Sequence, residues 1–518
     1  SSQLPVQIQA ALAIQAFIIN DAFKNSLDNY VLKLMERLME LSNKFDSDIL
    51  PAVMQELVES FPDKLEPFAD QLMEQLCIKL TSLLKSIGEM SNSLEDYDDF
   101  DNMANDKTST ALGILNTMIT ILLYFENSVD IISKLEVYYS QVIKLIFEDK
   151  IEDFYAEAGE LIENTLFLTR KVSPLMWSLL PQFVQCLLND EDITLYLEDS
   201  LPALKNYLIF GASTIQENVH VQELYYRIIL NVFEMDFDEG DVGFSDLVHI
   251  SDLATTFVLS LNSSIAGKYV PSLINYSSKF LIDINDTLKE KGKPFRIAVL
   301  DNIIASLVID PNSTLKTLIE SNQIENFMAN WFNSTDDLKR VFDIKLSILG
   351  YISLLSIDLQ SIDSMGLSRA LNTCGMNLTK LFIIIPQAIK DLEKKRSEYT
   401  DKSWENELTY NINQVNDDDD DVTANAGQTP LGGVDGEDDE EQDYSNFFTG
   451  ENKFSFESDE ELQEDPYSNT SLDNINIFSQ FKSFILGVQN NEGDKYGHIF
   501  GQLTDSDKEM LTSILNSI

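Results

Sequence analysis

Apolar residues recur with helical spacing along almost the whole chain. One stripe, for example, consists of Val31, Leu34, Met35, Leu38 and Met39, with charged residues at the positions between them. Spacings of three and four place side chains on one face of an α-helix. This periodicity predicts helices at residues 4–19, 31–39, 63–89, 108–125, 129–146, 151–168, 193–210, 215–234, 246–262, 266–288, 293–308, 322–332, 336–356, 366–395, 475–488 and 504–515. No alternating stretch of useful length predicts a strand.

An apolar residue followed by proline recurs within these apolar runs, at Pro5, Pro51, Pro181, Pro202, Pro271 and Pro386. Proline is tolerated in the first turn of a helix, so each case is interpreted as a helix start of one repeated kind. Ser173 followed by Pro174 predicts one more helix start, with the serine as N-cap. Roughly 20 helices in pairs of about 44 residues fall in the HEAT/armadillo window of about 40–47, whereas the shorter tetratricopeptide and ankyrin units fit less well. The predicted fold is an all-α, HEAT-repeat superhelical solenoid.

Charge narrows the range of partners. The chain has 518 residues with 36 Lys and Arg against 86 Asp and Glu, a formal charge of −50. Phosphate neutralisation needs Lys and Arg, so direct binding of nucleic acid is not expected, and an anionic membrane surface is equally unfavourable. No apolar run approaches the length of a membrane span, and we expect no membrane insertion. The negative electrostatic field of the chain instead favours basic partners.

Acidic residues gather in three segments, of which the longest, residues 413–468, has Lys453 as its one basic residue. Such a segment cannot bury enough apolar area to offset its ordering entropy, so we expect it to be disordered. The predicted organisation is a solenoid at 1–412, a disordered acidic insertion at 413–468 and closing helices at 469–518. A loop held at both ends stays near the repeat surface and, as a flexible coil of about 55 residues, spans roughly 40 Å.

The acidic segments are the candidate sites for a basic protein partner. In the long segment the candidate residues are Asp417, Asp418, Asp419, Asp420, Asp421, Asp435, Glu437, Asp438, Asp439, Glu440, Glu441, Asp459, Glu460 and Glu461. In the shorter segments, as secondary candidates, they are Glu95, Asp96, Asp98, Asp99, Asp101, Asp236, Asp238, Glu239 and Asp241. The alternative interpretation is that these loops only keep an apolar solenoid soluble.

Catalytic and metal-binding patterns do not emerge from the sequence. His220, His249 and His498 stand far apart, without partners at metal-ligand spacing. The stretch from Asp236 to Asp241 fails as a calcium loop, because its glycine stands at position five and position twelve is a leucine. The three cysteines form no framework, which favours a reducing compartment. We therefore predict no enzyme activity, no cofactor and no metal.

Several stretches resemble the importin-beta (karyopherin-beta) superfamily, and in particular its importin seven/eight branch. They are Leu4 to Ile14 (LPVQIQAALAI), Thr110 to Thr117 (TALGILNT), Val172 to Pro181 (VSPLMWSLLP), and the acidic insertion before two closing helices. The likeness extends over essentially the whole chain. Because the chain begins at Ser1 without an initiator methionine, it is interpreted as a fragment of a longer protein. The resemblance implies that this fragment is the C-terminal half.

The resemblance implies a nuclear import receptor that shuttles between cytoplasm and nucleus. Such a receptor would carry basic cargo, such as ribosomal proteins or histones, past phenylalanine-glycine (FG) nucleoporins. Ran-GTP would control it, mainly through a missing N-terminal half. Basic cargo would bind the acidic concave face and the 413–468 segment. Two alternatives remain open: an acidic chaperone or scaffold for histones or ribosomal proteins, and an export receptor of the same family.

Overall fold

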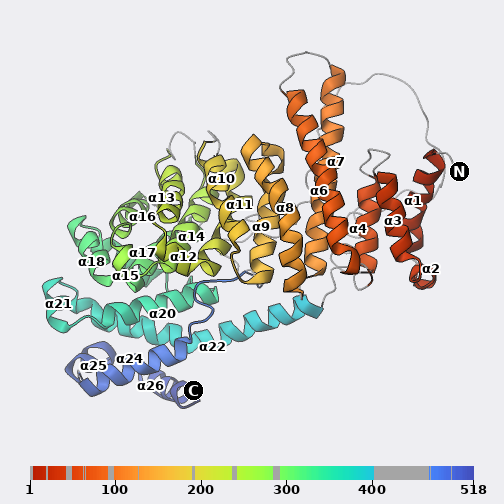
Figure 1. The fold of residues 1–518 in the computed structure, drawn as a ribbon. Coiled ribbons are helices and arrows are strands. Elements are labelled where there is room, and N and C mark those ends of the chain that lie inside the picture. The colour runs from red at the N-terminus through yellow and green to blue at the C-terminus, as the bar shows by residue number, and fades with distance from the viewer. Residues whose placement is uncertain are drawn as a thin grey trace, which may run out of the picture. The chain divides into compact units, whose positions relative to one another are not determined.

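The computed structural model is built from helices along the part of the chain that it describes (Figure 1). It describes residues 4–517 except 19–20, 43–48, 62–63, 65, 92–97, 126–127, 190–192, 236–241, 284–291, 402–465, 467 and 492. Within those ranges the secondary structure consists of α-helices and short 3-10 turns, and no strand is present. The predicted all-α class is confirmed.

The contacts of the chain divide it into two compact units. Unit 1 comprises Ser1–Asp283, Ala298–Phe327 and Asn469–Asn474. Unit 2 comprises Ile284–Ile297, Met328–Ser468 and Ile475–Ile518. The closing stretch of the chain, residues 475–518, therefore belongs to the same unit as the helix that precedes the long acidic segment.

Unit 1 is an array of antiparallel-type helix pairs, each packed on the next along the chain. The pairs are α3 (Val31–Ser42) with α4 (Ile49–Ser60), α6 (Ala69–Ser91) with α7 (Asp98–Tyr124), α8 (Val129–Asp149) with α9 (Tyr155–Thr169), α10 (Pro174–Asn189) with α11 (Ile193–Phe210), and α13 (Val219–Phe233) with α14 (Phe244–Ser260). The second helices pack in the order α4, α7, α9, α11, α14, and the first helices in the order α6, α8, α10, α13. Each helix thus contacts its partner and its counterpart in the next pair, which is the packing of a HEAT-type solenoid.

The remaining helices of unit 1 extend this array. α1 (Leu4–Ile18) packs on α4 and α2 (Asp21–Leu27), and η1 (Glu66–Phe68) and η2 (Glu152–Phe154) lead into α6 and α9. Beyond α14, α16 (Val270–Asp283) packs on α18 (Pro311–Glu320). The other elements are α12 (Ala212–Glu217), α15 (Ser263–Ala266), α17 (Lys293–Ile309) and α19 (Ile324–Asn333), the last two of which contribute residues to both units.

Unit 2 places helices from both sides of the acidic segment against each other. α22 (Leu371–Asp401) packs on α20 (Val341–Leu355), α25 (Gly493–Phe500) and α26 (Asp505–Ser517), while α24 (Ile477–Asn491) packs on α20 and α25. The ring centroids of Phe382 in α22 and Phe481 in α24 lie 3.8 Å apart in a stacked arrangement. Two smaller elements, α21 (Leu359–Ser364) and η4 (Ser368–Ala370), precede α22. The chain before and after residues 402–465 is therefore joined by direct packing.

The interpretation of the prolines as helix starts is wrong at three of the six positions. Pro5, Pro51 and Pro271 do lie in the first turn of α1, α4 and α16. Pro181, Pro202 and Pro386 instead lie inside α10, α11 and α22. An interior proline removes one backbone hydrogen bond, at a cost of roughly 3 kcal/mol. The burial of the neighbouring side chains, including Leu180, Leu201 and Ile385, offsets this cost.

The predicted helix start at Ser173 is confirmed, and hydrogen bonds around it connect neighbouring helices. The Ser173 hydroxyl accepts a hydrogen bond from the Met176 amide at 3.1 Å and donates to the buried carboxyl of Glu136 in α8. Burial raises the pKa of Glu136, and the hydrogen bond from Ser173 acts against that rise. One turn on, the Tyr207 hydroxyl of α11 donates to the Met176 carbonyl at 2.7 Å. The cap thus links three helices of two adjacent pairs.

Candidate binding surface

One face of unit 1 carries acidic side chains from three successive second helices, α9, α11 and α14. Its members, called here the acidic face, are Asp153, Glu157, Glu160, Glu198, Asp199, Asp246 and Asp252. Asp153, Glu157 and Glu160 follow one another at spacings of four and three through η2 and α9, so helical geometry brings them to one side. Asp153 is exposed and the other two are half-buried.

Close packing between α9 and α11 brings the next acids alongside. Gly159 faces α11, and a Cβ atom on it would lie only 3.5 Å from the Asp199 carbonyl oxygen. One turn further on, the Asn206 amide donates to the Glu163 carbonyl at 3.2 Å. On α11, Glu198 and Asp199 are both exposed. The packing of α9 on α11 therefore brings the two rows of carboxylates alongside each other.

α14 continues the face on the other side of α11. The Lys205 ammonium of α11 forms an ion pair with Asp252 of α14, with 2.6 Å between Nζ and Oδ2, and both side chains are partly buried. Asp246 and the buried His249 precede Asp252 by six and three positions on the same helix. Within the described structure, Lys205 is the basic residue of the acidic face, and its ammonium group is already paired with Asp252 of that face.

Mutual repulsion and burial perturb the titration of this face. Burial raises the pKa of Glu157 to about 7, and the charges of Glu160, Asp199 and Asp153 add to the rise. At His249 burial lowers the pKa, while the charges of Glu198, Asp252 and Asp246 act in the opposite direction. Each of the two perturbed groups feels one acid of α11, which is Asp199 for Glu157 and Glu198 for His249. The acids around α9 and those of α14 therefore meet at two adjacent residues of α11.

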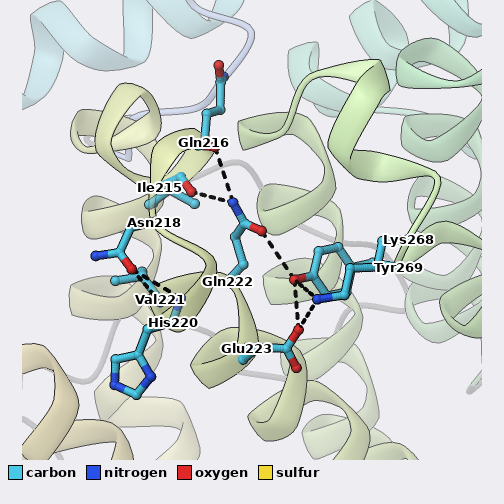
Figure 2. Close-up of polar contacts among 9 residues, drawn as sticks. All are labelled: Ile215, Gln216, Asn218, His220, Val221, Gln222, Glu223, Lys268 and Tyr269. Atoms are coloured by element: carbon cyan, nitrogen blue, oxygen red, sulfur yellow. Dashed lines mark hydrogen bonds and ion pairs between the residues drawn. The ribbon is translucent and has the colours of Figure 1, made fainter.

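A polar network fixes the chain immediately beyond the face, where α12, α13 and the turn before α16 meet (Figure 2). The buried Gln222 amide donates to the Ile215 carbonyl at 2.7 Å and to the Gln216 carbonyl at 3.3 Å. Its oxygen lies 3.2 Å from the Tyr269 hydroxyl, which also lies 3.0 Å from Glu223. Lys268 pairs with Glu223, and hydrogen bonding to that lysine lowers the pKa of the carboxyl.

The same network holds α14 in position. Gln216 donates from its side-chain amide to the Ser260 carbonyl at the end of α14, at 2.9 Å. Asn218 accepts from the amides of His220 and Val221 and caps α13 (Figure 2). One predicted helix, 215–234, is thus two helices, because the Asn218 cap ends α12 and begins α13.

Most residues that the sequence singled out as sites lie outside the described residues. This holds for Glu95, Asp96, Asp236, Asp238, Glu239, Asp241 and all the candidates between Asp417 and Glu461. Asp98, Asp99 and Asp101 differ, because they lie in the first turns of α7 and not in a loop between helices. The acidic segment 95–101 therefore overlaps the start of α7.

Sequence reasoning did not identify the acidic face by residue. Its members occur singly or in pairs on helices about 45 residues apart, so no run of acids marks them. The signal that was present is their recurrence at the repeat length. Among the described residues, no group of three or more His, Cys, Asp and Glu is placed to hold a metal ion. No helix in the same part of the chain is long and apolar enough to cross a membrane.

An all-α array of stacked helix pairs with a charged face defines a repeat scaffold of the kind that binds other proteins. The chain is 31% identical over its whole length to "Nonsense-mediated mRNA decay protein 5" of Saccharomyces cerevisiae, of which it covers 49%. It is 25% identical to importin-8 of Homo sapiens over 68% of this chain and 32% of that protein. It is 21% identical to a probable importin of Encephalitozoon cuniculi over its whole length and 48% of that protein.

The chain belongs to the importin-beta superfamily, as its resemblance to the importin seven/eight branch predicted. It spans between about a third and about half of the length of these relatives. No family model matches the chain. No solved structure matches it either.

Proposed function

We propose that the chain is part of a nuclear transport receptor that binds a basic protein cargo. The observation that supports this most is the acidic face of α9, α11 and α14, where seven carboxyl groups are accompanied by the single paired base Lys205. Its relatives include importin-8 of Homo sapiens and a probable importin-7 homolog of Dictyostelium discoideum. No covalent step is part of this function, and none of the proposed binding requires a cofactor.

The physical basis is relief of repulsion among the carboxylates. Burial is the main cause of the Glu157 pKa of about 7, and the like charges of Glu160, Asp199 and Asp153 add to it. A lysine or arginine side chain that reaches the face lowers that repulsion and gains charge-assisted hydrogen bonds. The wider field of a chain with a formal charge of −50 steers a basic partner towards the face and rejects an acidic one.

The long acidic segment would act as a second cargo element. Its runs at Asp417 to Asp421 and Glu437 to Glu441 are joined to unit 2 at both ends, by α22 and α24. Tethering raises the local concentration of those runs around a bound cargo. Contacts with FG nucleoporins, control by Ran-GTP and shuttling between nucleus and cytoplasm are further parts of the proposal, which rest on the importin relatives.

The test of the cargo site neutralises the face without changing its shape. Glu160→Gln, Glu198→Gln and Asp199→Asn are combined in one variant, and Glu36→Gln, Asp130→Asn and Glu325→Gln, on other helices, form the control with the same change in net charge. Binding of a histone tail peptide is measured by fluorescence anisotropy at near-physiological salt. We expect the face variant to lose at least tenfold in affinity, about 1.4 kcal/mol, and the control less than threefold. Equal losses in the two variants would contradict a localised cargo site.

Two further measurements separate the transport receptor from its alternatives. An acidic chaperone or scaffold for histones or ribosomal proteins need not bind FG repeats, so retention of the chain on immobilised FG peptides supports a receptor. An export receptor binds cargo together with Ran-GTP, whereas an import receptor releases it. Adding Ran-GTP to the complex of cargo with the full-length receptor therefore distinguishes the two directions.

A further inference from the structure

An exposed leucine and a half-buried tyrosine stand next to each other near the start of α11, at the edge of the acidic face. Leu195 is 67% exposed, more than any other large apolar side chain of the described residues. Tyr196 follows it and is half-buried. Glu198 and Asp199 come three and four positions after Leu195, so helical geometry brings these three side chains to one face of α11. An isolated exposed leucine is ordinary, whereas apolar surface rimmed by charged groups is typical of a contact with a partner.

Tyr196 is the outer end of a chain of aromatic rings. Its ring packs on Tyr155 of α9 in a T-shaped arrangement, with 5.3 Å between the centroids. Tyr155 in turn packs on Phe147 of α8, and Phe147 stacks on Phe183 of α10. These three inner rings are buried. The core therefore holds Tyr196 in place, while part of its side chain reaches solvent.

Carboxylates surround this ring. The Tyr196 hydroxyl donates a hydrogen bond to Oε2 of the exposed Glu152, with 3.3 Å between the two oxygens. Residues 148–160, which include Glu152, hold six acidic residues and one basic residue. Asp199 lies one turn after Tyr196 on α11, and its charge acts on Glu157 of α9. An aromatic ring beside carboxylates suits a guanidinium group, because the ring attracts the cation and a carboxylate pairs with it.

The same two helices hold an arginine in such surroundings at their carboxyl ends. Arg170, which follows α9, lies over the rings of Phe167 of α9 and Phe210 of α11, with its Cζ atom 4.2 and 5.4 Å from the two centroids. Burial lowers the pKa of Arg170, and the negative charge of Asp473 acts in the opposite direction. Two aromatic rings and a carboxylate thus accommodate an arginine of the chain itself. At the amino ends of these helices, two tyrosines and a glutamate supply the same kinds of group.

We infer that the start of α11 binds an arginine of the cargo together with an apolar residue next to it. The site, called here the Tyr196 site, consists of Glu152, Leu195, Tyr196 and Asp199. Its occupant rests on the proposed function, since the arginine is one of the side chains of the basic cargo, and charge complementarity selects it. The planar guanidinium stacks on the Tyr196 ring and pairs with a carboxylate, whereas the compact, strongly hydrated ammonium of lysine gains less from both contacts. The apolar neighbour covers Leu195.

The test compares three short fluorescent peptides of equal length and charge, by anisotropy at near-physiological salt. One contains arginines with a central leucine, the second has lysines in place of the arginines, and the third has serine in place of the leucine. We expect the wild type to bind the arginine-leucine peptide about fivefold more tightly than the lysine peptide. Tyr196→Leu, which removes the ring, should reduce this preference to less than about twofold, whereas Tyr196→Phe, which keeps the ring, should retain most of it. Tyr30→Leu, at an exposed tyrosine before α3, is the control and should leave the preference unchanged.

The apolar part of the site is tested by Leu195→Ser. This variant should bind the arginine-leucine peptide about threefold more weakly than the wild type does, and the serine peptide with unchanged affinity. Equal binding of the arginine and lysine peptides to the wild type, or an equal loss of both in Tyr196→Leu, would overturn the Tyr196 site and leave the proposed function standing. If the wild type binds none of the three peptides, the proposed function fails and the site fails with it.

Discussion

Replacing Glu157 by glutamine should stabilise unit 1 at neutral and alkaline pH but not in acid. Burial and the neighbouring acids raise the pKa of this carboxyl from 4.5 to about 7 in the folded chain. Between those two values the folded state binds the proton that the unfolded state has lost, so ionisation destabilises the fold as the pH rises. Glutamine keeps the size of the side chain and does not ionise.

The magnitude follows from the shift. Each unit of pKa difference corresponds to about 1.4 kcal/mol, so the difference between 4.5 and about 7 is worth about 3 kcal/mol once the pH exceeds 7. Near pH 4.5 the variant should gain only a few tenths of a kcal/mol, because the wild-type carboxyl is protonated in the fold and only half ionised in the unfolded chain.

Native-state hydrogen exchange of the amides of α9 and α11 is the appropriate assay, since long repeat arrays do not unfold in one step. Wild type and variant are compared at the same pH, at pH 5 and again at pH 8. The control is Glu36→Gln, which removes an exposed carboxyl from α3. A gain in protection at pH 8 no larger than at pH 5, or a gain shared by the control, would refute the assignment of a strained buried charge at Glu157.

Three further predictions concern the same part of the molecule. Binding of a basic partner to the acidic face should release a proton from Glu157, so the affinity should rise between pH 6 and pH 8. Titration calorimetry in buffers of different ionisation enthalpy measures the proton release. An affinity that does not depend on pH would argue against contact with that carboxyl. Gly211→Ala should cost about 1–3 kcal/mol, because the new methyl group would lie 2.5 Å from the Trp177 ring. Its thermal unfolding midpoint should be lower than that of the control Gly113→Ala, where the added methyl group meets no neighbouring atom within 4 Å. Gln222→Leu should cost about 1–3 kcal/mol, because it removes the buried amide that donates to the Ile215 and Gln216 carbonyls. Faster exchange confined to α12 and α13 would report this loss, and unchanged exchange there would show that the network is not required.

The hydrophobic periodicity predicted most of the helices closely. The helix expected at 193–210 is α11 at those bounds, and 4–19 and 129–146 differ from α1 and α8 by one to three residues at an end. The helix predictions fail where one local sequence motif is compatible with two different structures. Proline after an apolar residue marks a helix start in α16 but lies within α10, because tertiary burial overrides the local preference. Short elements such as α18 and α25 have too few turns to establish a period.

The acidic face was less predictable than the fold. The high negative charge predicted a basic partner, but Glu157 meets Asp199, and His249 meets Glu198, only when α9, α11 and α14 stack. Contacts between residues some 45 positions apart depend on the packing of whole helices, and no short stretch of the sequence indicates them.

The measurement that most directly tests recognition of basic cargo is the affinity of a basic ribosomal protein for the chain with and without residues 413–468, at low and near-physiological salt. We predict that the deletion weakens binding at least tenfold, about 1.4 kcal/mol, at near-physiological salt, and that the remaining affinity depends on the acidic face. Affinity that is unchanged by the deletion, or that vanishes for both forms once salt is raised, would contradict this account of the long acidic segment as a cargo element.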